Sequence, residues 1–283
     1  MHQSAQADRP QDGSTSAPES RPTGSTPPPG DRLAVSPARV PVHLDRAADE
    51  ARALLARDGA VVLTGHENTS DALVVAAAQV VGDRLRELYP HRVRTSRDGD
   101  PVHLHADSFD VVVDLGGAPQ RRRHPDEDHV LVQCARPAPE GGDSFALDAY
   151  AFVDHLATAD PALHDFLTGT DVDLYGAWAG LRGLPAVPRA GRHVEYTRTG
   201  RRVVRRTDGA VPLHRDPAAD HIHAQLARLG EAVLAAEQAL PRFRLDEGDI
   251  LVLDNYRCWH GRDAHRGERT VRILTLRSAD AHN

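Results

Sequence analysis

The sequence predicts an α+β protein in which a sandwich or barrel of strands is flanked by helices. Helical spacing of apolar residues is concentrated at the start of the folded part, in residues 44–58 and 70–81. Strand-like apolar runs dominate before and after one long helical stretch at about 219–239. Because helices and strands are segregated rather than alternating, this class is favoured over a parallel, doubly wound sheet.

The first 38 residues differ in composition from the rest, being rich in Ser, Pro, Gly, Gln and Asp. Such a segment buries too little apolar surface to offset the entropy of ordering it, so we expect residues 1–38 to be a disordered tail. The tail also lacks the basic start and apolar run of a signal peptide. Residues 39–283 suffice for one good-sized core and are few for two, which predicts a single domain.

The overall charge and the cysteine content exclude several classes of protein. A formal net charge of -7 gives no reason to expect nucleic acid or an anionic membrane as the partner. No apolar run approaches the roughly 18 residues needed to span a bilayer. The chain has two cysteines, Cys134 and Cys258, each in a strand-like stretch. This pattern favours a reducing cytoplasm over a secreted fold built on disulfides.

The elements of the N-terminal part follow from local spacing and capping residues. Apolar residues at helical spacing predict a helix over 44–58, with Gly59 as its C-terminal cap. The apolar run 60–63 predicts a strand that ends at Gly65. A second helix is expected over 70–81, because Ser70 is a good N-cap.

The rest of the chain is dominated by strand-like runs. The expected strands are 101–106, 110–115, 129–135, 249–254 and 270–277. The expected helices are 148–157, 161–168 and 219–239. Residues 193–206 predict a hairpin, since apolar residues flank the turn pair Thr199-Gly200.

A His-x-Asp triplet occurs four times, so the triplet alone identifies no site. The pairs are His43-Asp45, His105-Asp107, His124-Asp126 and His214-Asp216. The first lies at a helix entry, the third lies in a charged loop, and prolines flank the fourth. His105 and Asp107 close a strand-like run instead, and residues two apart on a strand project from the same face. Both side chains can therefore point at one metal ion.

A second candidate region covers residues 246–277, with the strand Ile250 to Leu253, a turn at Asp254-Asn255, and then His260. Two histidines and one carboxylate leave three positions of an octahedral ion open, which is what Fe(II) needs to bind a chelating cosubstrate and O2 together. A structural zinc site would more often recruit cysteine. His260 is therefore expected to join His105 and Asp107.

Four coordinated features of the chain resemble the taurine dioxygenase and clavaminate synthase group of 2-oxoglutarate oxygenases. They are His105-Ala-Asp107, then Gly141-Gly142-Asp143-Ser144, then Asp254-Asn255, and finally His260-Gly261-Arg262 with Arg269. Their order and spacing match the family over about 40–277. The resemblance implies a double-stranded β-helix (jelly-roll) core with flanking helices, formed by one catalytic domain over 39–283, and iron between its two sheets.

The resemblance also implies a role for each matching position. His105, Asp107 and His260 would bind Fe(II), and Arg269 would bind the distal carboxylate of 2-oxoglutarate through its planar guanidinium. Ser144 stands where the family usually has Thr and keeps the hydroxyl beside that carboxylate. Arg272 is the alternative anchor. Because Arg272 lies three residues further along a strand it faces the other side, so we favour Arg269.

The implied activity is oxidation, most commonly hydroxylation, of an unactivated C-H bond of a small molecule, with Fe(II), 2-oxoglutarate and O2. An amino acid or an amino-acid derivative in specialised metabolism, such as antibiotic biosynthesis, is the expected substrate. Position 273 is Ile where the taurine enzyme carries its sulfonate-binding Arg, which argues against a sulfonate. Asp107 is present where halogenating relatives carry a small residue, which argues against halogenation.

Other side chains are weaker candidates for the site. His103 shares a face with His105 and could line the pocket, although a surface position is the commoner one. Cys258 is expected in the core, and Tyr175 and Trp178 either line the substrate pocket or pack in the core. For Arg262, Arg266 and Arg272, and for Arg121 to Arg123, a solvated surface is the expectation.

Other functions stay open at this point. An oxygenase for small sulfonates, phosphonates or carboxylates would need Arg182 or one of Arg201 to Arg206 turned inward. A jelly-roll binding protein without turnover would be free to lose the ligands and Arg269, which are all present. A zinc hydrolase with the same three ligands would act without O2 or 2-oxoglutarate. A small-molecule substrate is the expected partner, and nothing in the sequence indicates an oligomeric state.

Overall fold

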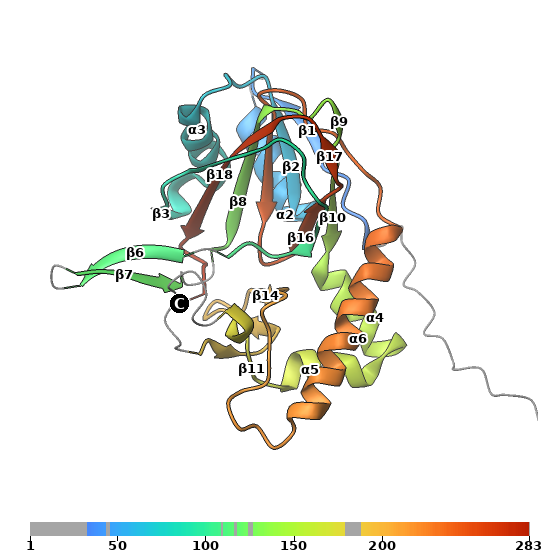
Figure 1. Ribbon diagram of the computed structural model, residues 1–283. Coiled ribbons are helices and arrows are strands. Elements are labelled where there is room, and N and C mark those ends of the chain that lie inside the picture. Colours follow the sequence, from blue (N-terminus) through green and yellow to red (C-terminus); the bar gives the residue numbers. More distant parts are fainter. Residues whose placement is uncertain are drawn as a thin grey trace, which may run out of the picture.

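The structure is a computed structural model that describes residues 33–43, 46–108, 110–115, 118–123, 127–178 and 188–282, with only the backbone described over 110–123. A seven-stranded sheet forms one layer (Figure 1). In spatial order its strands are β1 (Ala38–Pro41), β2 (Ala60–Thr64), β15 (Ile250–Asp254), β8 (His129–Arg136), β18 (Arg269–Ser278) and β3 (Leu85–Leu88), and β4 (Arg92–Ser96) also pairs with β18. Within this sheet only β1 and β2 run parallel.

Two helices cover the outer face of the large sheet: α2 (Ala47–Asp58) and α3 (Ser70–Val81). Their apolar faces pack on sheet residues such as Leu131 and Leu274, which form one buried cluster with them. Gly59 caps α2 in the left-handed conformation, with φ of 79°, as predicted. The predicted N-cap of α3 is wrong by one residue, because the side chain of Thr69 rather than Ser70 accepts from the N–H of Ala72.

A three-stranded sheet faces the inner side of the large sheet. Its order is β10 (Ser144–Asp148), β16 (Cys258–Arg262) and β5 (Val102–His105). Residues from both sheets meet in one buried cluster that includes Val62, Leu251, Ala146 and Cys258. Both cysteines are free and buried. The α+β class and the pairing of two layers of strands are therefore confirmed.

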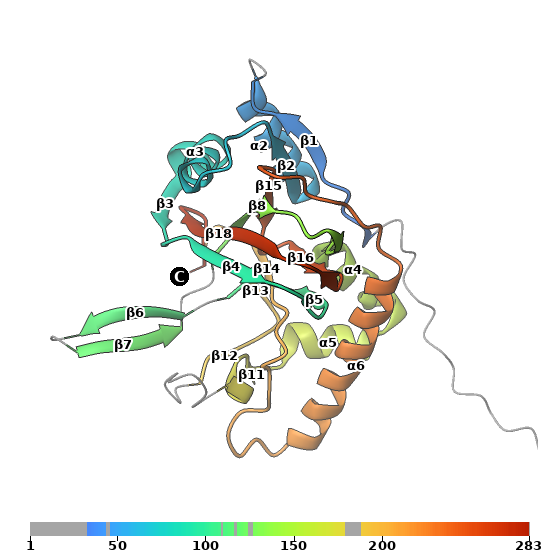
Figure 2. The ribbon, with the colours of Figure 1, turned by 45° about the horizontal axis from the view of Figure 1, so that its top comes forward.

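A second group of helices packs against the far side of the small sheet, away from α2 and α3 (Figure 2). These helices are α4 (Ala149–Ala159), α5 (Pro161–Gly169) and α6 (Ala219–Gln238). Trp259 of β16 is buried among them and lies 5.3 Å from Phe152, measured between ring centroids. The carboxylate of Glu237 on α6 accepts from the backbone N–H of Leu104 at 2.9 Å, so α6 also fixes β5.

Short turns and two-stranded ribbons complete the structure. The turns are the 3-10 helices η1 (Gly82–Arg84) and η2 (Gly176–Trp178). The ribbons are β6 (Asp110–Leu115) with β7 (Ala118–Arg123), β9 (Glu140–Gly141) with β17 (His265–Arg266), β11 (Val172–Asp173) with β12 (Ala190–Gly191), and β13 (Val194–Tyr196) with β14 (Arg202–Val204). The β13–β14 ribbon confirms the predicted hairpin at 193–206. The β6–β7 hairpin projects from the body (Figure 2).

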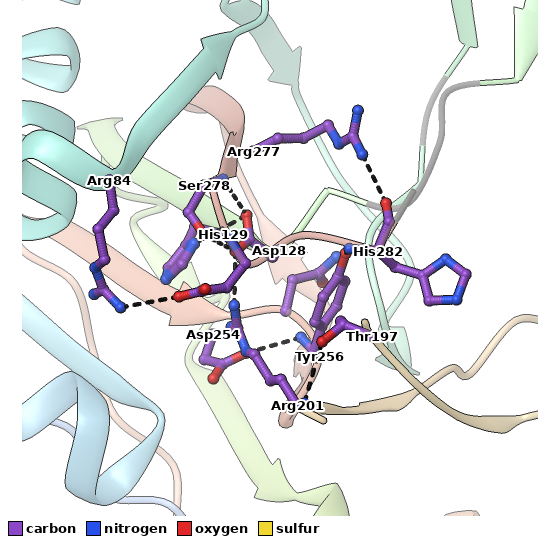
Figure 3. Close-up of polar contacts among 12 residues, drawn as sticks. Arg84, Asp128, His129, Thr197, Arg201, Asp254, Tyr256, Arg277, Ser278 and His282 are labelled. Atoms are coloured by element: carbon purple, nitrogen blue, oxygen red, sulfur yellow. Dashed lines mark hydrogen bonds and ion pairs between the residues drawn. The ribbon is translucent and has the colours of Figure 1, made fainter. Parts of the chain in front are cut away.

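A buried ionic network fastens β13–β14 to the large sheet (Figure 3). Asp128, which is fully buried, accepts from the backbone N–H and the hydroxyl of Ser278 at 2.8 and 2.5 Å. Arg201, in the hairpin turn, donates to Asp128 at 2.7 Å and to Asp254 at 2.8 Å. Burial alone would raise the pKa of Asp128, but His129, Arg201 and Ser278 together lower it, so this carboxylate stays charged. The hairpin is thus held at its turn.

The predicted limit of the N-terminal tail at residue 38 is wrong. Residues 1–32 lie outside the described part, but Leu33 and Val35 are 2% and 5% exposed. The N–H of Val35 donates to the carbonyl of Ala146 at 3.0 Å, and β1 begins at Ala38. Two isolated apolar residues give no periodic pattern, so only their packing on β10 shows that the fold starts by Leu33. Within the described residues, none of the helices combines the length and apolar character needed to cross a bilayer.

Candidate metal centre

The pairing of β16 with β5 brings two of the predicted ligands face to face. His260 lies directly opposite His105 in the antiparallel register, and their ring centroids are 4.5 Å apart. Asp107 follows two residues after the end of β5. One ligand atom from each of His105, Asp107 and His260 lies within 4.8 Å of the others. In the part of the chain that the structure describes, this is the only group of three or more such side chains.

The hydrogen bonds of His105 fix which of its nitrogens faces the centre. Its Nδ1 lies 2.9 Å from the carbonyl oxygen of His103, which can only accept, so Nδ1 carries a proton. Its Nε2 lies 3.3 Å from Oδ1 of Asp107. Without a metal this nitrogen donates to the carboxylate, and a metal ion between the two atoms would take the place of that proton. A hydrogen bond from the other ring nitrogen to a carbonyl, like that of Nδ1 to His103, is what orients metal-binding histidines.

The electrostatics of the cluster suit a metal ion. Burial would raise the pKa of Asp107, but the hydrogen bond from His105 and the fields of His260, His105 and Arg92 lower it overall. Burial, followed by the charge of His105, lowers the pKa of His260 to about 4. Burial also opposes protonation of His105, but Asp107 and the carbonyl of His103 raise its pKa. Once a metal ion takes the place of the proton on Nε2 of His105, the donor set is an anionic carboxylate and two imidazoles, which fits Fe(II).

Two residues to which the sequence assigned no role, Asn255 and Arg92, contact Asp107. Asn255, which is 4% exposed, accepts from the N–H of Asp107 at 2.9 Å and donates to its carbonyl at 3.0 Å. The same amide donates to the carbonyl of Glu127 at 2.9 Å. A guanidinium nitrogen of Arg92 lies 3.9 Å from Oδ2 of Asp107. Asn255 belongs to a quoted motif and could have been found there, whereas Arg92 lies in a strand that no pattern predicted.

Asn255→Ala should weaken Fe(II) binding about 10- to 100-fold, the range for residues that orient metal ligands. The substitution removes both hydrogen bonds that hold the backbone of Asp107. Competition against a fluorescent chelator measures the affinity, and circular dichroism checks the fold. Asn68→Ala is the matched control, because that amide bonds to the carbonyl of Ala135 and to Glu247, away from the cluster. Unchanged affinity in folded Asn255→Ala would show that Asp107 needs no such support.

Arg269 lies on the inner face, and no described residue pairs with its charge. Its Cδ is 3.5 Å from where a Cβ on Gly142 would lie, so it sits beside the Gly141-Gly142 loop. Burial, and then the nearby charge of Arg262, lower its pKa. Among the residues that the structure describes, none forms a hydrogen bond or ion pair with its guanidinium. A largely buried cation of this kind is suited to bind an anion.

Arg272 faces the other way, as predicted from its spacing. It donates to Oδ1 of Asn68 at 2.6 Å and to Oε1 of Gln133 at 2.9 Å, on the face that carries the helices. The expected solvated surface is therefore wrong for Arg272. It is also wrong for Arg262, which is partly buried and donates to the carbonyls of Asp263 and Asp100 at 2.7 and 2.8 Å. Arg266 is exposed, as expected.

Ser144 begins β10 directly opposite Arg262 of β16. It is 7% exposed and shares the inner face of its strand with Ala146, whose partner across the sheet is His260. The hydroxyl of Ser144 therefore lies on the same side of the small sheet as the histidine, in the direction of Arg262.

The other singled-out residues fall into three groups. His103 pairs with Glu237 at 2.9 Å and lines a cavity next to His105. Trp178 lines the same cavity and stacks on Tyr175 with ring centroids 5.9 Å apart. Burial raises the pKa of Cys258 well above its usual value, as expected for a thiol in the core. Arg182 and the side chains of Arg121 to Arg123 lie outside the described residues.

The arginines of the β13–β14 region do not supply an inward, unpaired cation. Arg201 binds Asp128 and Asp254, and the remaining pairs are Arg202 with Asp154, Arg205 with Glu195, and Arg206 with Asp208. Among the other His-x-Asp pairs, Asp45 and both His124 and Asp126 lie outside the described residues. Asp216 accepts from the N–H of Ala218 at 2.8 Å, so it closes a turn.

Two facing sheets with a His-Asp-His cluster on an inner face are typical of non-haem iron oxygenases. The family model "Taurine catabolism dioxygenase TauD, TfdA family" matches residues 23–276 of the chain. The chain belongs to this family and is a 2-oxoglutarate-dependent non-haem iron dioxygenase, with Fe(II), 2-oxoglutarate and O2 as its cofactor and cosubstrates.

Solved structures of low sequence identity share the fold. AAD-2 in complex with Mn(II) and N-oxalylglycine is 15% identical, with a TM-score of 0.59, over 85% of this chain and 90% of that one. PvcB, an Fe, alpha-ketoglutarate dependent oxygenase from an isonitrile synthetic pathway, is 17% identical, with a TM-score of 0.57, over 86% and 84%. The non-heme iron oxygenase OrfP in complex with Fe is 15% identical, with a TM-score of 0.53, over 84% and 80%. No curated protein sequence matches the chain.

Proposed function

We propose that His105, Asp107 and His260 bind Fe(II), and that the enzyme hydroxylates a C-H bond of a small molecule, namely an amino acid or amino-acid derivative of specialised metabolism. The convergence of the three side chains carries this proposal. On this proposal the two facing sheets form a double-stranded β-helix with the iron between them. Fe(II) with 2-oxoglutarate and O2 supplies the oxidising chemistry and yields succinate and CO2.

The residues around the cluster have separate tasks in this proposal. Arg269 binds the distal carboxylate of 2-oxoglutarate, and the hydroxyl of Ser144 donates to the same group. The two imidazoles and Asp107 occupy one side of the ion and leave the other side to the cosubstrates. Asn255 keeps the backbone of Asp107 in place, so the carboxylate is oriented before any ligand binds. The protein's own contribution is thus orientation and the exclusion of water.

The paired arginines disfavour the alternative of a sulfonate, phosphonate or carboxylate substrate. Each of Arg201, Arg202, Arg205 and Arg206 already has a carboxylate partner. An anionic substrate would have to break one of these pairs. A binding protein without turnover would have no need of the cluster and of Arg269 together.

Anaerobic absorption spectroscopy tests the proposal. Wild-type protein with Fe(II) and 2-oxoglutarate should develop a visible metal-to-ligand charge-transfer band, and O2 should then yield succinate. Failure of the wild-type protein to bind Fe(II) and 2-oxoglutarate would overturn the proposal. Hydrolysis of a substrate with zinc, without O2 and 2-oxoglutarate, would also overturn it.

A further inference from the structure

We propose that the organic substrate carries a cationic nitrogen, which binds between the carboxylate of Asp208 and the ring of Trp178. This inference rests on the proposed function, because it takes the cavity beside His105 as the substrate site. It narrows the substrate class from amino-acid derivatives in general to those that present an ammonium or guanidinium group to this cavity.

The cavity is lined both by residues of the metal cluster and by the segment after β14. It has a volume of about 360 Å³, and its lining includes His103, His105 and Asp107. Trp178 and residues 206–208 also line it. The N–H of Ala106 donates to the carbonyl of Arg206 at 3.1 Å, so this segment runs directly beside the ligand-bearing chain. A molecule in the cavity can therefore touch Asp208 while one of its C-H bonds faces the metal cluster.

The accessible charge contributed by residues 206–208 is negative. The Arg206 side chain is 12% exposed, whereas that of Asp208 is 72% exposed. Oδ1 of Asp208 accepts from Arg206 at 2.8 Å, and no described residue forms a hydrogen bond or ion pair with Oδ2. Arg206 thus binds one oxygen of the carboxylate, and Oδ2 is available to a ligand.

An aromatic ring lies next to this carboxylate. The indole of Trp178 packs so closely on Gly209 that a Cβ there would lie 3.0 Å from it. Gly209 follows Asp208 directly, so ring and carboxylate belong to the same wall of the cavity. A cation gains from an aromatic face as well as from a carboxylate, whereas a carboxylate or sulfonate would be repelled by Asp208.

Calorimetric titration of protein loaded with Mn(II) and N-oxalylglycine, which does not turn over, tests the inference. The probes are L-lysine, L-arginine and L-ornithine, each with a counterpart whose side chain is uncharged: the side-chain N-acetyl form of lysine and of ornithine, and citrulline for arginine. L-leucine is the probe without a side-chain cation. Isethionate, a sulfonate without an amine, serves as the anionic probe. We expect at least one amine or guanidine to bind, with a Kd at least tenfold lower than that of its uncharged counterpart.

The variant Asp208→Asn should raise the Kd of that probe at least tenfold and change the Kd of its uncharged counterpart less than twofold. Trp178→Ala should also weaken binding of the cation, and Trp178→Phe should restore most of it. Asp154→Asn is the matched control, because that carboxylate pairs with Arg202 outside the cavity lining.

Three results would overturn the inference: no cationic probe binds, isethionate binds best, or Asp208→Asn leaves the Kd of the cation within twofold. In each case wild-type protein still binds Mn(II) and N-oxalylglycine. Failure of wild-type protein to bind those two would instead overturn the proposed function.

Discussion

Asp107→Ala is expected to abolish both the anaerobic charge-transfer band and succinate formation, with activity falling more than about 100-fold. The carboxylate is the only anionic member of the three-residue cluster. Its lowered pKa shows that the surroundings stabilise the charge, chiefly through the hydrogen bond from His105 once burial is overcome. Without this anion, two imidazoles would remain to hold the ion. Anaerobic spectra with Fe(II) and 2-oxoglutarate, together with a succinate assay, measure both effects.

The matched control is Asp216→Ala, which changes the aspartate of another His-x-Asp pair. Asp216 accepts from the N–H of Ala218, so its loss should cost at most about 1 kcal/mol of stability. The spectrum of this variant should equal that of the wild type. An unchanged band in Asp107→Ala would show that the iron binds elsewhere, whatever the control does.

Arg269→Gln should raise the Kd of 2-oxoglutarate about 100-fold. The guanidinium is largely buried beside Gly142 and has no partner among the described residues. Loss of two charge-assisted hydrogen bonds costs roughly 3 kcal/mol, and each 1.4 kcal/mol corresponds to a factor of ten. Titration of 2-oxoglutarate into the anaerobic Fe(II) protein, followed by the charge-transfer band, measures the Kd.

Arg272→Gln is the corresponding control on the same strand. Its hydrogen bonds to Asn68 and Gln133 lie on the opposite face of the sheet, so some stability should be lost but the Kd should stay within about twofold. The reverse pattern, with Arg272→Gln impaired and Arg269→Gln normal, would assign the anchor to Arg272.

Local signals predicted the helices and several central strands. Gly59 marks the end of α2, and the apolar run 250–253 marks β15. Because successive side chains of a strand point to opposite faces, the sequence correctly placed Arg269 and Arg272 on different faces of the sheet. The three predicted metal ligands lie together because β16 pairs with β5 in a register that places His260 opposite His105. No local property of β5 or β16 predicts that they pair. The order of the motifs along the whole chain indicated that His260 joins His105 and Asp107.

Features that depend on tertiary packing could not be predicted in this way. Strands β3 and β4 expose most of their side chains and therefore show no apolar pattern, so Arg92 was missed with them. Leu33 and Val35 are ordered by contacts with β10 rather than by neighbours in sequence. The carboxylate partners of Arg201 and Arg202 lie 48 or more positions away in the chain. Local sequence patterns therefore do not predict these ion pairs.

The network around Asp128 keeps the anchoring of the β13–β14 hairpin separate from the lining of the cavity. Arg201 anchors the β13–β14 hairpin to the large sheet at its turn, whereas residues 206–208 line the cavity beyond the end of β14. Residues 206–208 and Trp178 belong neither to that anchor nor to the strands β5 and β16. Paralogues could therefore diverge in the compounds they accept through a few changes in one wall, while the inherited oxidative chemistry stays the same.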